Sequence, residues 1–281
     1  MVYSGASGSV QGPRGLSMAS VQDERLAREV EVGGVRLEPF EFGSGKPILV
    51  LHEGQGFSPD AAFVGGLAKS HRVIAPSHPG FGRSERPGDI DTVDDLAHLY
   101  LEFIHDFGLH EVTVLGFSLG GWIAAEVATR CSHDIGRLVL VDAVGIRPGE
   151  PTDRPILDIF GVPPEVLFQK TFAHPERHIP DFSTFGDDDF LTLARNREAT
   201  AVYGWDPYMH NPKLQGRLAR LRIPTLVVWG EDDGIVSVEY GRTLAGSVPD
   251  GRFVTIPDAG HLPHLEQPDV FVGVVEEFLG P

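Results

Sequence analysis

One feature constrains the fold of this chain more than any other: an apolar run that ends at a serine between two glycines. The run extends from Val112 to Leu115 and leads into Gly116-Phe117-Ser118-Leu119-Gly120, after which a helical pattern continues to Arg130. Because glycine has no side chain, neighbouring backbone can approach the serine closely and the chain can turn sharply. The Ser118 hydroxyl would then stand above the sheet edge, beside a helix N-terminus that favours negative charge. The pattern predicts a serine nucleophile on a strand–turn–helix.

Short apolar runs alternate with longer helical patterns along most of the chain. Strand-like runs lie at 47–51, 72–75, 112–115, 137–141, 223–229 and 252–256, and helical patterns at 60–69, 92–107, 121–130, 238–247 and 268–279. Two amphipathic runs, at 28–32 and 35–42, precede them and are expected to form an antiparallel edge. This alternation predicts the α/β class, with a mostly parallel sheet covered by helices on both faces.

The alternation stops in a proline-rich stretch between Ala143 and Pro212. The stretch holds two helical patterns, near 164–171 and 188–203, and it is too long for a simple crossover. Ligands bind at the carboxyl edge of the strands in open α/β sheets, so we expect this stretch to roof the Ser118 site. The expected division is a tail (1–22), a core (23–142 and 213–281) and a helical cap (143–212).

Composition limits the partners and the compartment. The chain of 281 residues has 23 basic and 40 acidic residues, a net charge of −17, which argues against nucleic acid or an anionic membrane as partner. The glycine- and serine-rich segment 1–22 lacks the apolar stretch of a signal peptide, and we expect it to be disordered. The single cysteine, Cys131, indicates a reducing compartment and is expected to pack in the core. These features predict a soluble, cytoplasmic protein that acts on a small molecule, with a homo-oligomer left open.

Two loops downstream of Ser118 carry the groups that a serine nucleophile needs. A serine hydroxyl is a poor nucleophile near neutral pH unless an imidazole, itself oriented by a carboxylate, takes its proton. Gly230-Glu231-Asp232-Asp233 follows one strand-like run, and Gly260-His261 follows the next. Parallel strands would bring both loops to the edge where Ser118 stands. His261 is therefore the predicted base.

The order of these motifs resembles the α/β-hydrolase superfamily over residues 36–279. The nucleophile elbow of the family matches residues 116–120, and its Gly-x-x-Asp acid turn matches residues 230–233. Its Gly-His loop matches residues 260–261, and a turn that is common after its fourth strand matches residues 79–84. The resemblance implies an eight-stranded, mostly parallel sheet with the cap inserted after the sixth strand. It selects Asp233 over Asp232 as the acid. Asp142 is the alternative, because some members of the family place their acid there; otherwise it caps the turn into the following segment.

The resemblance also implies an oxyanion hole built from the N–H groups of Leu119 and Gly54. The family pattern usually begins His-Gly, whereas His52 is followed here by Glu53. A carboxylate aimed at the developing oxyanion would raise its energy, so we expect Glu53 to be solvated beside a functional hole. We also count it as a candidate pocket residue.

The expected cap is rich in aromatic residues, which suits a hydrophobic substrate. Trp205 and Tyr208 are the candidate pocket residues among them. His261-x-x-His264 resembles a metal-ligand spacing, but no third ligand is in register, so we expect neither a metal nor a cofactor, and His264 to serve packing.

Three functions are compatible with the sequence. The first is a serine hydrolase that cleaves a carboxylic ester or lactone through an acyl-enzyme. The second is a carbon–carbon bond hydrolase of ring-fission-type dienones with the same triad; such enzymes commonly carry tryptophan after the histidine, where this chain has Leu262. The third is a non-catalytic ligand-binding protein. Family branches that open epoxides or displace halide carry aspartate at the elbow, so Ser118 argues against both.

Overall fold

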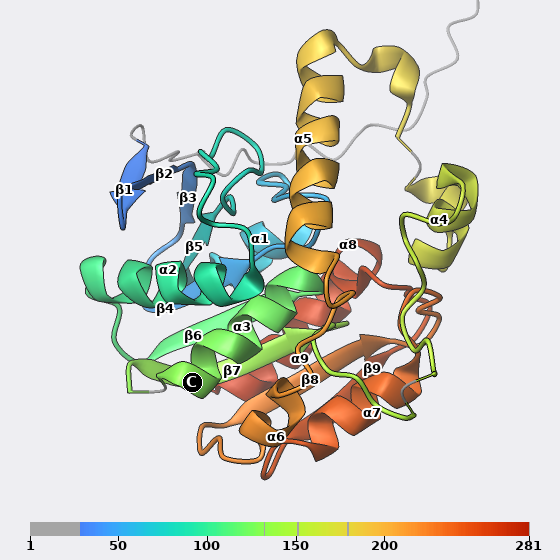
Figure 1. The fold of residues 1–281 in the computed structure, drawn as a ribbon. Helices are drawn as coiled ribbons and strands as arrows, with labels where there is room; N and C mark the ends of the chain where they lie inside the picture. The colour runs from blue at the N-terminus through green and yellow to red at the C-terminus, as the bar shows by residue number, and fades with distance from the viewer. Residues whose placement is uncertain (1–28, 132, 151, 179, 281) are drawn as a thin grey trace, which may run out of the picture.

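The computed structural model describes residues 29–131, 133–150, 152–178 and 180–280 (Figure 1). The expected disordered tail, residues 1–22, lies outside the described residues. Within those ranges, no helix combines the length and the apolar character that crossing a membrane requires.

A seven-stranded sheet with the order β3-β5-β4-β6-β7-β8-β9 forms the centre of the molecule. Its strands are β3 (Pro39–Phe42), β4 (Lys46–Leu51), β5 (His71–Pro76), β6 (Val112–Phe117), β7 (Ile135–Val141), β8 (Thr225–Gly230) and β9 (Arg252–Ile256). β3 is antiparallel to β5, and all other neighbours are parallel. The mostly parallel sheet is thus confirmed. The expected count of eight strands is wrong for the described residues, which form seven in this sheet.

A separate hairpin accounts for the different count. β1 (Val30–Val32) and β2 (Val35–Leu37) pair with each other around Gly33 and Gly34, both at positive φ. The amphipathic run 35–42 is divided at Glu38, whose N–H donates to Ser84 Oγ and whose carbonyl accepts the Ser77 N–H. The backbone at Glu38 therefore bonds to the loop after β5, and the hairpin does not join the main sheet.

Both faces of the sheet are covered, and the strands alternate between two apolar cores. On β4, Leu49 and Leu51 join the core beneath α2 and α3, whereas Ile48 and Val50 join the core beneath α1 and α9. The helices that cover the sheet are α1 (Ala62–Leu67), α2 (Val93–Asp106), α3 (Leu119–Arg130), α7 (Val238–Gly246) and α9 (Pro268–Leu279). Figure 1 shows α2, α3 and α7 on the near face and α1 and α9 behind.

The start of α2 and the end of α3 follow from the local sequence, but the residue after α3 is not where it was expected. α2 begins at a capping box, in which Thr92 accepts the Asp95 N–H and the Asp95 side chain accepts the Thr92 N–H. α3 ends at Arg130, and the following Cys131 is exposed, so the expectation that this cysteine packs in the core was wrong.

Residues 142–224 join β7 to β8 and rise from the carboxyl edge of the sheet. They contain α4 (Pro164–Thr171), 3₁₀ turns at Pro175–Arg177 and Phe182–Thr184, α5 (Asp187–Gly204) and α6 (Leu214–Leu218). Both helices expected here are confirmed. The first half of α5 is exposed and stands away from the sheet, while its second half packs against the core (Figure 1). The segment follows the fifth strand of the main sheet along the chain, not the sixth.

Candidate active site

Ser118 lies on a strained turn between β6 and α3. Its φ of 47° and ψ of −111° fall outside the regions that a residue with a side chain normally adopts. A Cβ on Gly116 would lie 2.3 Å from the carbonyl oxygen of Gly120, and one on Gly120 would lie 2.0 Å from that of Leu51. Both glycines are therefore required by close backbone contacts, which hold the serine at the carboxyl end of β6.

His261 and Asp233 complete a hydrogen-bonded chain that begins at Ser118. The Ser118 hydroxyl donates to His261 Nε2 at 2.8 Å, and His261 Nδ1 donates to Asp233 Oδ2 at 2.8 Å. Backbone groups fix both partners: Asp233 Oδ1 accepts the N–H groups of Ile235 and Val236 at 2.7 and 2.9 Å, and the His261 N–H donates to the carbonyl of Thr171 at 2.7 Å. The arrangement places an imidazole ready to take the serine proton, with a carboxylate that fixes its tautomer.

Neither of the two competing acids is hydrogen-bonded to His261 in the described part of the chain. Asp232 is exposed, and its N–H donates to the carbonyl of Ala259. Asp142 is fully buried at the end of β7, and its Oδ1 accepts the Gly230 N–H at 2.9 Å. The hydrogen bond to His261 is made by Asp233, as the resemblance implies.

Two buried histidines, His52 and His78, hold the loop after β4 through hydrogen bonds to its backbone and to each other. His52 Nδ1 donates to the carbonyl of Glu53 at 2.7 Å, and the N–H of His78 donates to His52 Nε2 at 2.9 Å. His78 Nε2 donates back to the carbonyl of His52 at 3.0 Å. Burial lowers the pKa of His52 to about 4, so the ring is neutral near pH 7. The role of His78 was missed from the sequence, although it directly precedes the family turn at 79–84.

Glu53 is buried, with 8% of its surface exposed, so the expectation of a solvated carboxylate was wrong. Burial raises the pKa of Glu53 to about 7, although the nearby His261 opposes the rise. The nearest basic group is His264 Nε2, 3.9 Å from Glu53 Oε2. Burial lowers the pKa of His264 to about 3, so this stacked partner of Phe117 supplies no charge. A protonated, neutral Glu53 is therefore well populated near pH 7.

The second half of α5 holds the same loop from above. Asn196 Nδ2 donates to the carbonyl of Gln55 at 2.6 Å, and Thr200 Oγ1 donates to the carbonyl of Gly54 at 2.8 Å. A Cβ on Gly54 would lie 2.9 Å from the Thr200 side chain, so the helix contacts the loop directly. The position of Gly54 therefore depends on a helix that lies far away in the sequence.

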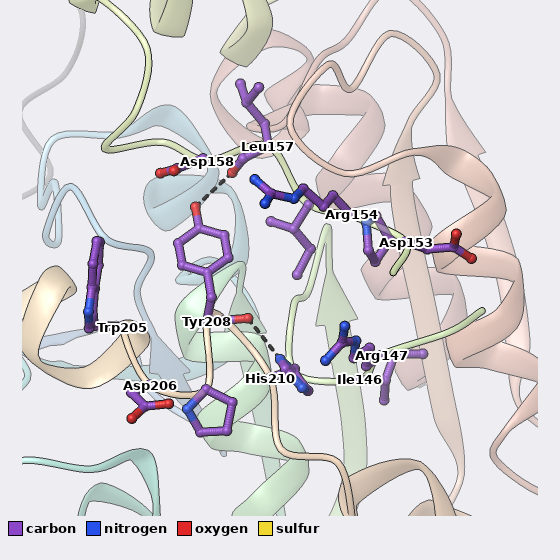
Figure 2. Close-up of a pocket in the computed structure, with 13 residues that line it drawn as sticks. Ile146, Arg147, Asp153, Arg154, Leu157, Asp158, Trp205, Asp206, Tyr208 and His210 are labelled. Carbon is purple, nitrogen blue, oxygen red and sulfur yellow. Dashed lines mark hydrogen bonds between the residues drawn. The ribbon is translucent and has the colours of Figure 1, made fainter. Parts of the chain in front are cut away.

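Trp205 and Tyr208 line a cavity of about 690 Å³ that includes none of Ser118, Asp233 and His261 (Figure 2). Tyr208 Oη donates to the carbonyl of Leu157 at 2.7 Å and accepts the Ile159 N–H at 2.9 Å. Trp205 is 60% exposed. The structure therefore places these two residues in a cavity that the serine does not line, and the Tyr208 hydroxyl links residues 157 and 159 to residue 208.

Asp142, Asp233 and His261 are the described residues that could together ligate a metal ion, since their ligand atoms lie within 4.8 Å of one another. The facing atoms of His261 and Asp233 are already joined by a hydrogen bond. The donor set is therefore that of the hydrogen-bonded chain described above.

The chain is similar to known hydrolases over most of its length. The model of the alpha/beta hydrolase family matches residues 48–274. A 2-hydroxy-6-oxo-6-(2'-aminophenyl)hexa-2,4-dienoic acid hydrolase of Metapseudomonas resinovorans is 28% identical, covering 90% of this chain and 91% of that protein. A 2-hydroxymuconate semialdehyde hydrolase of Pseudomonas putida is 26% identical, covering 93% and 96%. The structure of a thermophilic esterase from Thermogutta terrifontis superposes with a TM-score of 0.71 at 25% identity, covering 90% and 98%.

Proposed function

We propose that this chain, which belongs to the alpha/beta hydrolase family, is a serine hydrolase that cleaves a carboxylic ester or lactone of a small, hydrophobic substrate. The observation that carries the proposal is the unbroken chain of hydrogen bonds from Ser118 through His261 to Asp233. Two 2.8 Å contacts in the required order supply a nucleophile, a base and an orienting acid.

In the proposed reaction, Ser118 Oγ attacks the substrate carbonyl while its proton passes to His261 Nε2. Asp233 stabilises the imidazolium that forms, and His261 then returns the proton to the leaving oxygen. Water, activated by the same imidazole, hydrolyses the acyl-enzyme and releases the acid. The first proton transfer uses the Ser118–His261 contact that the structure already contains.

The oxyanion is proposed to bind the N–H groups of Leu119 and Gly54. Leu119 is the first residue of α3, so its N–H has no acceptor within the helix and lies at the positive end of the helix dipole. The end of β4 packs on the elbow at Gly120, which supports placing Gly54 on the same side. Because a carboxylate there would oppose the oxyanion, we infer that Glu53 acts as a neutral group in the productive state.

We propose that residues 143–212 form a cap over this site, with 23–142 and 213–281 as the core. The support is the contact of α5 with the loop at Gly54 and Gln55, which links the inserted segment to the proposed oxyanion hole. We also propose a reducing, cytoplasmic location, because the exposed Cys131 is the single cysteine of the chain. The acidic composition supports a small-molecule substrate and argues against nucleic acid or a membrane as partner.

A carbon–carbon bond hydrolase is the second candidate, and the similarity to two hydrolases named for dienoic acid and semialdehyde substrates supports it about equally. Such an enzyme would use the same three residues. Leu262, buried beside His261, stands where these enzymes commonly have tryptophan. The bond that is cleaved must therefore be decided by assay.

The test combines active-site labelling with a substrate panel. A fluorophosphonate probe should label the wild type, and Ser118→Ala should abolish labelling. Turnover of short aryl esters or lactones would support the first candidate, and turnover of ring-fission dienones alone would favour the second. Absence of labelling and of turnover would contradict both and leave a ligand-binding protein.

A further inference from the structure

Asp142 is a buried carboxyl group that the proposed triad does not use. It has a φ of 43°, a left-handed conformation that is costly for a residue with a side chain. Its N–H donates to the carbonyl of Val228 at 3.0 Å, and its Oδ1 accepts the N–H of Gly230 at 2.9 Å. Both bonds reach β8, so the neighbouring strand fixes the direction of the side chain.

The second oxygen of this carboxyl group has no donor among the described residues. Asp142 Oδ2 is buried and accepts no hydrogen bond from any residue that the structure describes. Ligand atoms of Asp142, Asp233 and His261 lie within 4.8 Å of one another, and the negative charge of Glu266 of α8 (Pro263–Glu266) further disfavours an ionised Asp142. Two ionised carboxylates this close in a buried site repel strongly, so one of them must hold a proton.

The hydrogen-bond partners decide which carboxyl group is protonated. Asp233 accepts three hydrogen bonds, from the N–H groups of Ile235 and Val236 and from His261 Nδ1. Asp142 accepts one. Donors stabilise the ionised form, so the negative charge belongs on Asp233. In agreement, burial and then the charge of Asp233 raise the pKa of Asp142 well above its usual range.

We propose that Asp142 is protonated and donates a hydrogen bond from its carboxyl O–H to the Asp233 carboxylate, which makes it a positioning residue for the triad. The predicted effect of Asp142 on the rate rests on the proposed function, whereas the position of the proton does not. The proton stays on Asp142 throughout, so the pair carries a single negative charge. The added donor fixes the Asp233 carboxylate and draws part of its charge away from His261.

The decisive comparison is between Asp142→Asn and Asp142→Ala. An asparagine keeps the acceptor for Gly230 and replaces the O–H donor with an N–H donor, so D142N should retain kcat within about threefold, with an unshifted pH–rate profile. D142A removes the donor, so kcat should fall about tenfold. The acidic limb of its profile should move to higher pH, because Asp233 then presents its full charge to His261.

Two kinetic results would overturn the proposal. A loss on the order of 10⁴-fold in D142N would show that Asp142 itself is the charged acid. A D142A variant with a lower thermal midpoint but an unshifted pH–rate profile would show a purely structural role.

Infrared difference spectroscopy tests the proton independently of activity or of the folding of D142A. Glu53→Gln serves as the background, so that the carboxyl group of Glu53 does not contribute to the spectrum. At neutral pH this variant should show a carboxylic-acid C=O band. The band should be absent from the double variant Glu53→Gln/Asp142→Asn. Absence of that band would refute the proposal even if the fluorophosphonate test succeeds. A band present in a protein that the probe does not label would instead contradict only the proposed function.

Discussion

The two sides of Ser118 are built in different ways. On the acid side, His261 and Asp233 stand on the loops that follow β9 and β8, and the two N–H groups that hold Asp233 come from the next residues of its own loop. On the side of the proposed oxyanion hole (below, the oxyanion side), the loop after β4 is held by side chains from other parts of the chain, His78 and two residues of α5. One side is encoded by contiguous motifs, and the other depends on long-range packing.

Two carboxyl groups near His261, Asp233 and Glu53, show how this difference affects charge. Asp233 accepts three hydrogen bonds, whereas at Glu53 burial outweighs one backbone N–H and the nearby His261, and its pKa rises to about 7. Burial alone disfavours a charge, and donors are what make a buried charge tolerable. Removing the carboxylate of Asp233 should therefore lower activity, whereas replacing the carboxyl group of Glu53 should stabilise the folded protein.

Asp233→Asn is expected to have the largest effect. An asparagine amide no longer favours the tautomer in which His261 Nε2 accepts the serine proton, so kcat should fall on the order of 10⁴-fold. The measurement is the hydrolysis rate of an aryl ester together with the rate of fluorophosphonate labelling. Asp232→Asn, an exposed neighbour in the same turn, is the matched control and should stay near wild type. The reverse ranking would place the acid at Asp232.

Glu53→Gln should change the pH dependence of stability. The pKa of Glu53 is raised from 4.5 to about 7 on folding, so the native state binds more protons than the unfolded state between these values. The contribution of Glu53 to the free energy of unfolding therefore falls by about 3 kcal/mol as pH rises through this window. Above the window it no longer changes with pH. Urea unfolding at about pH 5 and pH 8 measures the difference between variant and wild type.

The E53Q variant should gain stability relative to wild type as the pH rises across that window. Glu277→Gln, at an exposed position of α9, serves as the control and should follow wild type. An equal dependence in E53Q and wild type would mean that Glu53 is solvated after all.

Asn196→Ala is expected to have the smallest effect, confined to the oxyanion side. It removes the donor to the carbonyl of Gln55 and the acceptor of the Gly82 N–H, which should lower the free energy of unfolding by about 2 kcal/mol and slow turnover severalfold. Thermal unfolding and kcat are measured together. Thr192→Ala, in the exposed first half of α5, is the control. If both variants behave alike, the second half of α5 does not support the loop.

The sequence was most informative where one motif carries its own geometry. The strand–serine–helix pattern at Ser118 needed only the two glycines, and the loops of Asp233 and His261 followed from the parallel order of the strands. It failed where partners are distant: Glu53 was expected in solvent and Cys131 in the core. Each of these depends on which remote element covers the residue.

The sequence by itself determined the fold class, the alternation of strands and helices in the core, and the three residues proposed as the triad, because short-range spacing and strand polarity suffice for them. Only the tertiary structure decided that the first two strands form their own hairpin, that Asp142 stands against Asp233, and that Glu53 is enclosed. The physical reason is that burial and hydrogen-bond donors, not residue type, set the charge of a carboxyl group, and both come from segments far apart in the chain.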